Sequence, residues 1–175
     1  MENPKIKIAT SKGDMIAELY EDRAPNTVAN IITLAESGYY TDMGFHRILK
    51  GFMAQGGCPH TKPGADGHPG TGGPGYTISE EFHPTLRHNE RGILSMAKTS
   101  APNSTGGQFF ILFRDYAPLD DGYSVFGKIV EGLDVLDALE AAGAHSDPHP
   151  PTEDIRFSIS VVSKNPHEYT VEKYS

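Results

Sequence analysis

The chain has 175 residues, which is enough for one ordinary domain with a single sizeable core. Hydrophobic residues make up 37% of it and charged residues 22%, a balance that excludes a disordered or membrane-embedded chain. The 15 basic and 23 acidic residues give a formal net charge of −8. That charge argues against a general nucleic-acid binder, because neutralising phosphates requires clustered cations.

The single cysteine and the N-terminal sequence indicate the compartment. One cysteine, Cys58, excludes an internal disulfide and with it a disulfide-stapled secreted scaffold. The first residues lead directly into an alternating segment without the apolar stretch of a secretory leader, and no run of about 18 apolar residues could span a membrane. We therefore expect a cytoplasmic protein that does not bind membranes, and nothing in the sequence suggests more than a monomer.

The first elements in chain order are a hairpin and a helix. Apolar and polar residues alternate on both sides of the turn at residues 11–13, which predicts two antiparallel strands. Pro25 then opens a stretch with apolar residues at helical spacing, and Gly38 follows its last turn. The apolar positions of this predicted helix are Val28, Ile31, Ile32 and Ala35.

Short strands and a long loop follow. Two apolar runs, 45–49 and 52–55, are separated by Lys50-Gly51. From residue 56 to 75 the composition changes to Gly, Pro, His and Thr, which predicts a long surface loop of the kind that is usually functional or mobile. Strand-like runs then resume at 92–97, 108–113 and 123–130.

The C-terminal third contains one more helix and one more strand. Gly132 precedes the helical pattern, residues 144–151 hold three prolines and cannot be regular, and residues 155–161 alternate cleanly. About eight strands and two helices without βαβ alternation predict a mostly β fold, a closed antiparallel barrel with helices at its ends. We expect one domain over 1–175, with a core of about 5–163 and a polar tail, 164–175, on the surface.

Other motifs lack the context that their functions need. Gly70–Gly75 matches G-x-G-x-x-G, but loop sequence precedes it and an extended segment follows, so a dinucleotide site is not expected. The histidines at 60, 68, 83 and 88 lack the paired spacing of zinc sites and are interpreted as solvated loop residues. We expect no metal and no other cofactor.

Arg47 is the one cation in an otherwise apolar run. The next run supplies an aromatic ring, a thioether and an amide at Phe52, Met53 and Gln55, which could surround a guanidinium. From this stretch alone, the better interpretation is that Arg47 caps a barrel end or pairs with a surface acid.

Several motifs together resemble the cyclophilin family of peptidyl-prolyl isomerases. The pattern F-H-R-x-x-x-x-F-M-x-Q-G-G runs unbroken from Phe45 to Gly57. It is followed in the family's order by the Gly-rich loop and by three strand motifs, Gly70–Gly73, Ser95–Ala97, Gln108–Phe110 and Val125–Gly127. The resemblance extends from about Ile6 to Val162 and implies an eight-stranded antiparallel barrel closed by two helices.

The resemblance also implies an activity and a set of site residues. The activity is rotation about X-Pro bonds in Pro-containing peptides and in unfolded or folding proteins, without metal, nucleotide or covalent intermediate. Arg47 would be the catalytic guanidinium. An apolar pocket for the proline ring would come from Phe52, Met53, Phe110 and Leu119, hydrogen bonds to the substrate backbone from Gln55 and Gln108, and the lining of the groove from Gly70, Ala97 and, beside the pocket, Tyr123.

Two other functions stay open at this point. One is a catalytically weak cyclophilin-like module that binds Pro-containing segments, although such a binder has no need of the guanidinium. The other is a β-barrel with a structural or small-ligand role.

The chain also departs from the family's commonest pattern. The segment between Ala97 and Asn103 is one residue longer than in the common eukaryotic form and is similar to bacterial members. Pro118 stands where the best-known members have a tryptophan that helps bind the drug cyclosporin, so we expect weak cyclosporin binding. Tyr123 replaces a common histidine, and the unusual loop Cys58–Gly67 could alter substrate preference.

Overall fold

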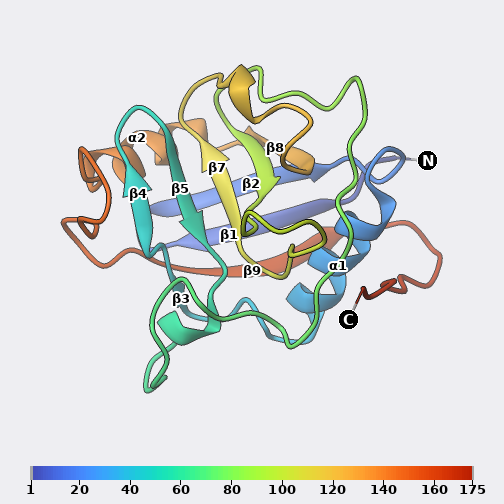
Figure 1. The fold of residues 1–175 in the computed structure, drawn as a ribbon, viewed down its shortest axis with the longest axis horizontal. Helices are drawn as coiled ribbons and strands as arrows, with labels where there is room; N and C mark the ends of the chain where they lie inside the picture. The colour runs from blue at the N-terminus through green and yellow to red at the C-terminus, as the bar shows by residue number, and fades with distance from the viewer. Residues whose placement is uncertain (1, 175) are drawn as a thin grey trace.

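The computed structural model describes residues 2–174 as a mostly β fold with two α-helices (Figure 1). The first half of the chain forms β1 (Lys5–Thr10), β2 (Gly13–Leu19), α1 (Pro25–Glu36), β3 (Met43–Gly44), β4 (Arg47–Leu49) and β5 (Met53–Gly56). The second half forms β6 (Ile93–Met96), β7 (Phe109–Leu112), β8 (Val125–Glu131), α2 (Leu133–Ala141) and β9 (Arg156–Ser163). Two short 3-10 helices, η1 (Pro59–Thr61) and η2 (Ala117–Leu119), lie in the loops.

The strands form one sheet in the order β3-β9-β1-β2-β8-β6-β7-β5-β4, and neighbouring strands are antiparallel. The expected eight strands become nine because Met43–Gly44 forms a two-residue strand on β9, which is too short to show as a periodic pattern. Within residues 2–174 this order ends at β3 and β4, which are not paired with each other. The closure of the barrel therefore stays a prediction, while the mostly β fold with two helices is confirmed.

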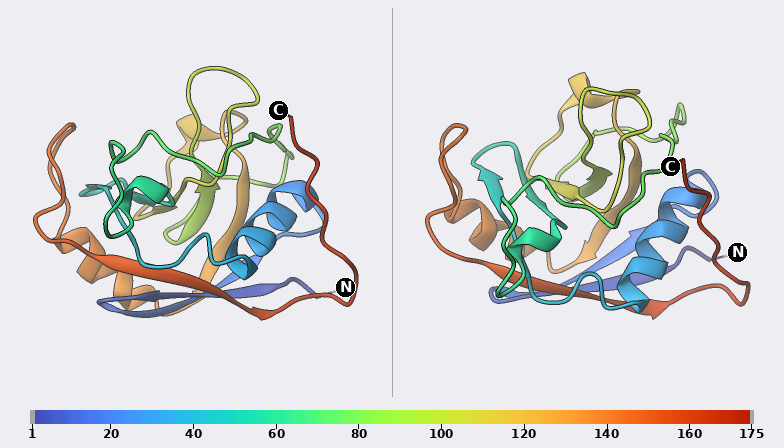
Figure 2. Two further views of the ribbon diagram at one scale, coloured as in Figure 1. Left: turned by 90° about the horizontal axis from the view of Figure 1, so that it is seen from below. Right: turned by 60° about the horizontal axis from the view of Figure 1, so that its bottom comes forward.

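The sheet curls around a single core. Figure 2 shows β1 and β9 running beneath the shorter strands β5 to β7, with α1 at one end and α2 at the other. Side chains from both parts of the sheet meet between them, and Phe109 of β7 packs edge-on against Phe157 of β9 with ring centroids 5.7 Å apart. Both rings are almost fully buried. The core thus joins β7, which carries one of the motifs, to the last strand of the chain.

Helix α1 begins at Pro25, as the sequence predicted, but its N-terminal amides are capped from a distant loop. The Glu81 carboxylate accepts hydrogen bonds from the backbone N–H of Asn26 (3.1 Å) and of Thr27 (2.6 Å). A carboxylate at this end satisfies two amides that have no partner in the helix and complements the helix dipole. Further along α1, the buried Asn30 donates to the Gly106 carbonyl at 2.9 Å, and so ties the helix to the segment before β7.

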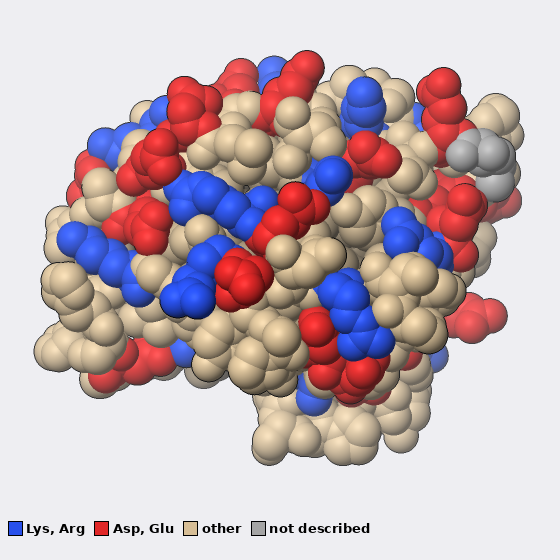
Figure 3. Space-filling view, turned by 90° about the horizontal axis from the view of Figure 1, so that it is seen from above, with Lys and Arg blue, Asp and Glu red and all other residues tan. Residues whose placement is uncertain are grey.

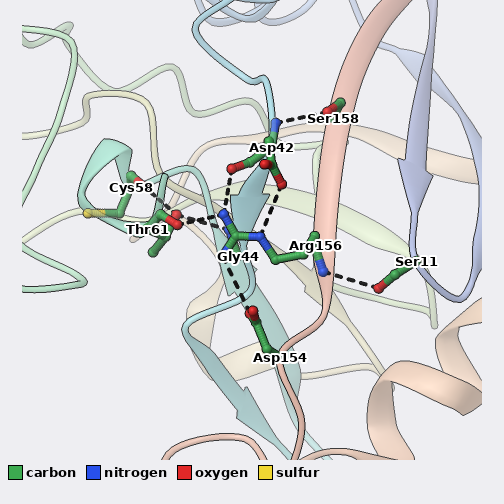
Figure 4. Close-up of polar contacts among 8 residues, drawn as sticks. All are labelled: Ser11, Asp42, Gly44, Cys58, Thr61, Asp154, Arg156 and Ser158. Carbon is green, nitrogen blue, oxygen red and sulfur yellow. Dashed lines mark hydrogen bonds and ion pairs between the residues drawn. The ribbon is translucent and has the colours of Figure 1, made fainter. Parts of the chain in front are cut away.

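The long loop after β5 is held against β9 by one arginine. Arg156 donates from Nη2 to the carbonyls of Asp42 (2.6 Å) and Thr61 (2.7 Å), and from Nε to the Asp42 carboxylate (Figure 4). The Thr61 hydroxyl donates to the Cys58 carbonyl and accepts from the Gly44 amide. The first turn of the loop, η1, is therefore fixed to the sheet.

The segment after α2 is an irregular loop with a closed base. The Thr152 amide donates to the Ala142 carbonyl at 2.8 Å, so the two ends of the loop meet. Near its start, Ala144 forms an isolated bridge with Leu49 of β4. The irregular conformation that the prolines predicted is confirmed, and the Asp147–Pro148 peptide bond is cis.

The described part of the C-terminal tail, residues 164–174, contacts Glu21 through three of its side chains. Glu21 accepts hydrogen bonds from the Tyr169 hydroxyl and the Asn165 amide, and its other oxygen lies 2.8 Å from His167 Nε2. No helix within residues 2–174 has both the length and the hydropathy needed to cross a membrane.

Gly57 is the position where the fold depends most clearly on a missing side chain. Its φ is +98°, and a Cβ there would lie 2.4 Å from the Gly107 carbonyl oxygen. We expect Gly57→Ala to lower the free energy of unfolding by about 2 kcal/mol or more, since a left-handed backbone and a backbone clash act together. Urea denaturation would measure the loss.

Gly51→Ala is the matched control for that substitution. Gly51 has a φ of +75° but open space around its Cβ position, so it pays only the backbone term of about 1 kcal/mol. Equal losses in the two variants would contradict the clash at Gly57.

Candidate active site

The centre of the site is a row of hydrogen bonds that crosses neighbouring strands. Arg47 of β4 and Gln55 of β5 are cross-strand partners. Arg47 Nη1 donates to Gln55 Oε1 at 3.1 Å, and Gln55 Nε2 donates to Gln108 Oε1 at 3.0 Å, just before β7. Because Arg47 can only donate, the orientation of both amides follows from its position.

The same row fixes the Gly-rich loop. Gln108 Nε2 donates to the carbonyls of Gly70 and Gly72, at 2.9 Å each. On the other side, the Sγ atom of the buried Cys58 accepts from the amides of the same two glycines, at 3.3 Å each. The loop that resembled a dinucleotide motif is thus clamped beside Gln108, without a helix following it, and Cys58 has a structural role.

A hollow of about 470 Å³, lined by both apolar and polar side chains, lies next to Arg47. Phe110, which is almost fully buried, forms one side of it, and Tyr123 packs edge-on against that ring with centroids 5.9 Å apart. The hollow is lined by all but one of the predicted site residues, namely Arg47, Phe52, Met53, Gln55, Gly70, Ala97, Phe110, Leu119 and Tyr123. The remaining one, Gln108, lines an adjoining hollow of about 450 Å³ that also contains Gln55, Gly70 and Ala97.

The structure adds residues that the sequence analysis did not assign. His46, Pro69 and Lys98 line the hollow beside predicted residues, and Asp147, Pro148 and His149 reach it from the loop after α2. His46 lies within the first motif, and Pro69 and Lys98 are direct neighbours of motif residues, so their places could have been anticipated. The other three lie about a hundred positions from Arg47 in a segment without a motif, and only the folded chain brings them there.

Asp147 makes the closest of these contacts. Its carboxylate accepts hydrogen bonds from Arg47 Nε at 3.0 Å and from Arg47 Nη2 at 2.6 Å. These bonds lower the pKa of the Asp147 carboxyl below its ordinary value. Arg47 therefore both pairs with a surface acid, as one interpretation of the sequence predicted, and lines the hollow.

His88 corrects the interpretation of the loop histidines as solvated. It is buried, because it packs behind Phe110 with nearly parallel rings and centroids 6.2 Å apart. Its Nδ1 lies 2.9 Å from the Asp120 carboxylate and its Nε2 lies 2.9 Å from the Ser95 hydroxyl. Burial lowers the pKa of His88, which favours a neutral ring that donates to Asp120 and accepts from Ser95.

The contacts from Asp120 to His88 to Ser95 are the same as those between the residues of a serine hydrolase triad, but this trio cannot act as a nucleophile on a substrate. Ser95 is fully buried on β6, where its hydroxyl cannot reach a substrate carbonyl. The trio instead supports Phe110 from behind. No periodicity marks His88, since it precedes β6 in an irregular segment, and no sequence pattern indicates this role.

His46 is the titratable group next to Arg47 in the sequence. Burial, and secondarily the Arg47 charge, lower its pKa to about 4. Its Nδ1 is buried and has no hydrogen-bond partner among the described residues. Because His46 is neutral at pH 7, Arg47 is the charged member of this pair of neighbouring residues beside the hollow.

The departures from the common family pattern also lie at the site. Pro118 is within η2, which presents Leu119 to the hollow. Tyr123 contacts Phe110, and the Lys98 ammonium lies 5.6 Å from the centroid of the Tyr123 ring. At the two positions where the sequence departs from the common pattern, the site thus has the short turn that contains Pro118 and the phenol of Tyr123.

The surface charges are mixed. On the face shown in Figure 3, Lys and Arg side chains alternate with Asp and Glu and form no continuous basic area. Exposed ion pairs elsewhere in the described chain include Arg87–Asp121, Arg91–Asp137 and Lys128–Glu90. Such pairs each contribute about 0–1 kcal/mol to stability and do not constitute a binding site.

Comparison with known proteins decides the family. Residues 5–161 match the family model described as cyclophilin type peptidyl-prolyl cis-trans isomerase/CLD. The chain belongs to the cyclophilin family. It is a peptidyl-prolyl cis-trans isomerase, which removes the structural or small-ligand barrel as a function for it.

Relatives from animals and bacteria agree with this assignment. The chain is 37% identical over 161 residues to a peptidyl-prolyl cis-trans isomerase-like 3 of Gallus gallus, which covers 92% of this chain and 97% of the relative. It is 45% identical over 136 residues to a peptidyl-prolyl cis-trans isomerase of Helicobacter pylori, which covers 76% and 78%. The bacterial-like form stays a prediction, because relatives of both origins match.

A solved cyclophilin has the same fold. The Cryptosporidium parvum cyclophilin type peptidyl-prolyl cis-trans isomerase, crystallised in the presence of the dipeptide Ala-Pro, superposes with a TM-score of 0.82 at 35% identity. The comparison covers 91% of this chain and 99% of the solved one.

The low pKa of His46 predicts a pH dependence of stability. The pKa of about 4 in the folded state lies below the 6.5 of an ordinary histidine, so the unfolded chain binds more protons between these values. The free energy of unfolding contributed by His46 therefore falls as the pH is lowered from about 6.5 towards 4. His46→Gln should flatten this dependence in urea titrations at successive pH values. Equal slopes for both proteins would show that His46 is not the group responsible.

Proposed function

We propose that Arg47 accelerates rotation about the X-Pro bond by donating a hydrogen bond to the proline nitrogen. In the twisted transition state this nitrogen becomes pyramidal and regains its lone pair, whereas in the planar ground state resonance withdraws it. A guanidinium that is held in place then binds the transition state better than the ground state. The observation that carries the proposal is the position of Arg47, held by Gln55 at the rim of the hollow that Phe52, Met53 and Phe110 line.

The energies needed are within reach of such a contact. The uncatalysed barrier is about 18–20 kcal/mol, and each factor of ten in rate requires about 1.4 kcal/mol. A hydrogen bond from a positioned donor that forms only in the transition state can supply about two such factors. No proton transfer is involved, so the low pKa of His46 is compatible with the mechanism.

The remaining predicted residues take binding roles in this proposal. Phe52, Met53, Phe110 and Leu119 hold the proline ring by burying its apolar surface. Gln55 and Gln108 face the substrate backbone, and Gly70, Ala97 and Tyr123 complete the rim. Support for a Pro-containing ligand comes from the solved relative that was crystallised with Ala-Pro.

The substrates are Pro-containing peptides and segments of unfolded or folding proteins. The groove is open and reads mainly a proline ring and backbone, which favours a broad range of clients. Action as a monomer in the cytoplasm also belongs to this proposal.

Arg47→Ala tests the role of the guanidinium. We expect kcat/KM for cis–trans exchange of a Pro-containing peptide to fall by about 10²-fold, because the donor to the nitrogen is lost. NMR exchange spectroscopy measures the rate directly, and thermal unfolding shows whether the variant is folded.

Arg114→Ala is the control, since Arg114 is an exposed arginine that does not line the hollow. It should keep the full rate. A wild-type rate for Arg47→Ala would overturn the proposed mechanism, even though the chain would remain an isomerase.

The rim predicts weak inhibition by cyclosporin. With Pro118 in η2, the chain lacks the indole that the drug contacts in the family's best-known members. We expect Pro118→Trp to lower the concentration needed for half inhibition in the same exchange assay. Sub-micromolar inhibition of the wild-type protein would contradict this expectation.

A further inference from the structure

We infer that Asp147 is a positioning residue for isomerisation, which holds the Arg47 guanidinium with its free donors towards the substrate. This inference rests on the proposed function of Arg47. It adds a residue from a loop that carries none of the family's motifs.

Asp147 and Gln55 accept hydrogen bonds from different N–H groups of the Arg47 guanidinium. A guanidinium carries five N–H groups in a rigid planar fork. Asp147 accepts from Nε and from Nη2, which is the side edge of the fork, and Gln55 accepts from Nη1. The remaining two N–H groups, one on Nη1 and one on Nη2, have no partner among residues 2–174 and are available to a ligand.

The contacts with Gln55 and with Asp147 restrict different motions of the guanidinium. Gln55 alone holds one nitrogen and leaves the guanidinium able to swing about that hydrogen bond. A bidentate carboxylate fixes the plane of the fork as well as its direction. Since the side chain of Arg47 is 37% exposed, packing by itself does not supply this constraint.

The loop that carries Asp147 is hydrogen-bonded to β4, the strand that carries Arg47. The Ala144 amide donates to the Ile48 carbonyl at 2.9 Å, and the Lys50 amide donates to the Ala144 carbonyl at 2.9 Å. The base of the loop therefore lies along the outer edge of β4, three residues before Asp147. In Figure 2 this loop, in orange, rises beyond the end of the sheet on the side of β4.

Hydrogen bonds within the loop hold its backbone in place before a substrate binds. Its ends are joined by the hydrogen bond from Thr152 to Ala142, and the His149 amide donates to the Ser146 carbonyl across Asp147. Three prolines, Pro148, Pro150 and Pro151, restrict the backbone that follows. A carboxylate on such a loop can orient a side chain at a small cost in conformational entropy.

Asp147 is not explained by stability alone. Its side chain is 49% exposed, and an exposed ion pair adds little to the folded state. The loop could also have approached Arg47 end-on and blocked it, but the carboxylate takes the side edge and leaves the tip of the fork free.

The test compares Asp147→Asn with wild type in the peptide exchange assay. Asn keeps the shape of the side chain but can accept only one of the two hydrogen bonds, so the fork loses its fixed plane. We expect kcat to fall about tenfold or more, with KM changed less than twofold, because orientation and not binding is lost. The NMR signal of the Arg47 Nε–H should broaden and exchange faster with water, while the Tm shifts by no more than a few degrees.

Asp154→Asn is the matched control. Asp154 follows the same loop and pairs with Arg156 at 3.4 Å, so its substitution removes the same charge from the same region without touching Arg47. It should leave kcat and the Arg47 signal unchanged.

The outcomes separate this inference from the proposed function. If Arg47→Ala loses activity but Asp147→Asn keeps the wild-type kcat, or gains activity, the positioning role is wrong and the role of Arg47 stands. If Arg47→Ala keeps its activity, the proposed role of the Arg47 guanidinium is wrong, whatever the result for Asp147→Asn.

Discussion

The hydrogen bond between Arg47 and Gln55 is the interaction on which the rest of the site depends. It joins two strands in direct register, so the short ladder of β4 and β5 places the guanidinium. Because Arg47 only donates, it orients the Gln55 amide, which orients the Gln108 amide, which in turn holds the Gly-rich loop. One cation thus sets the direction of a hydrogen-bond row that reaches from β4 to the far wall of the groove.

The apolar side of the site is fixed by packing rather than by polar contacts. Phe110 has the core beneath it, His88 behind it and Tyr123 against its edge. A ring that is held on these sides cannot yield when a proline ring enters. The site therefore combines a hydrophobic surface with a charged donor, each held in place, and the proposed mechanism uses both.

Much of this arrangement could be predicted from the sequence, because it lies in continuous motifs on strands. Arg47, Met53 and Gln55 come from one pair of adjacent strands, and Phe52 comes from the three-residue turn between them, so alternation and turn length determine which side chains meet. The helices were predictable for a similar reason, since Pro25 and the apolar spacing after it are local signals.

The residues that could not be predicted act across long separations or in irregular segments. Glu81 caps α1 from 54 residues away, and Asp147 pairs with Arg47 across 100 residues. The loop-like sequence around His88 predicts a solvated ring, although the fold buries it behind Phe110. Strand β3 was missed because two residues make no pattern. In each case the deciding contact is tertiary, and neither propensity nor spacing contains it.

The central claim is that a fixed fork of donors, and not a positive charge alone, lowers the barrier to rotation. Arg47→Lys tests it most directly, because lysine keeps the charge but has neither the planar fork nor the paired donors that Gln55 and Asp147 hold. The exchange rate of a Pro-containing peptide, measured by NMR with each protein at the same concentration, should be at least about tenfold lower for this variant. A rate equal to that of the wild-type protein would contradict the account.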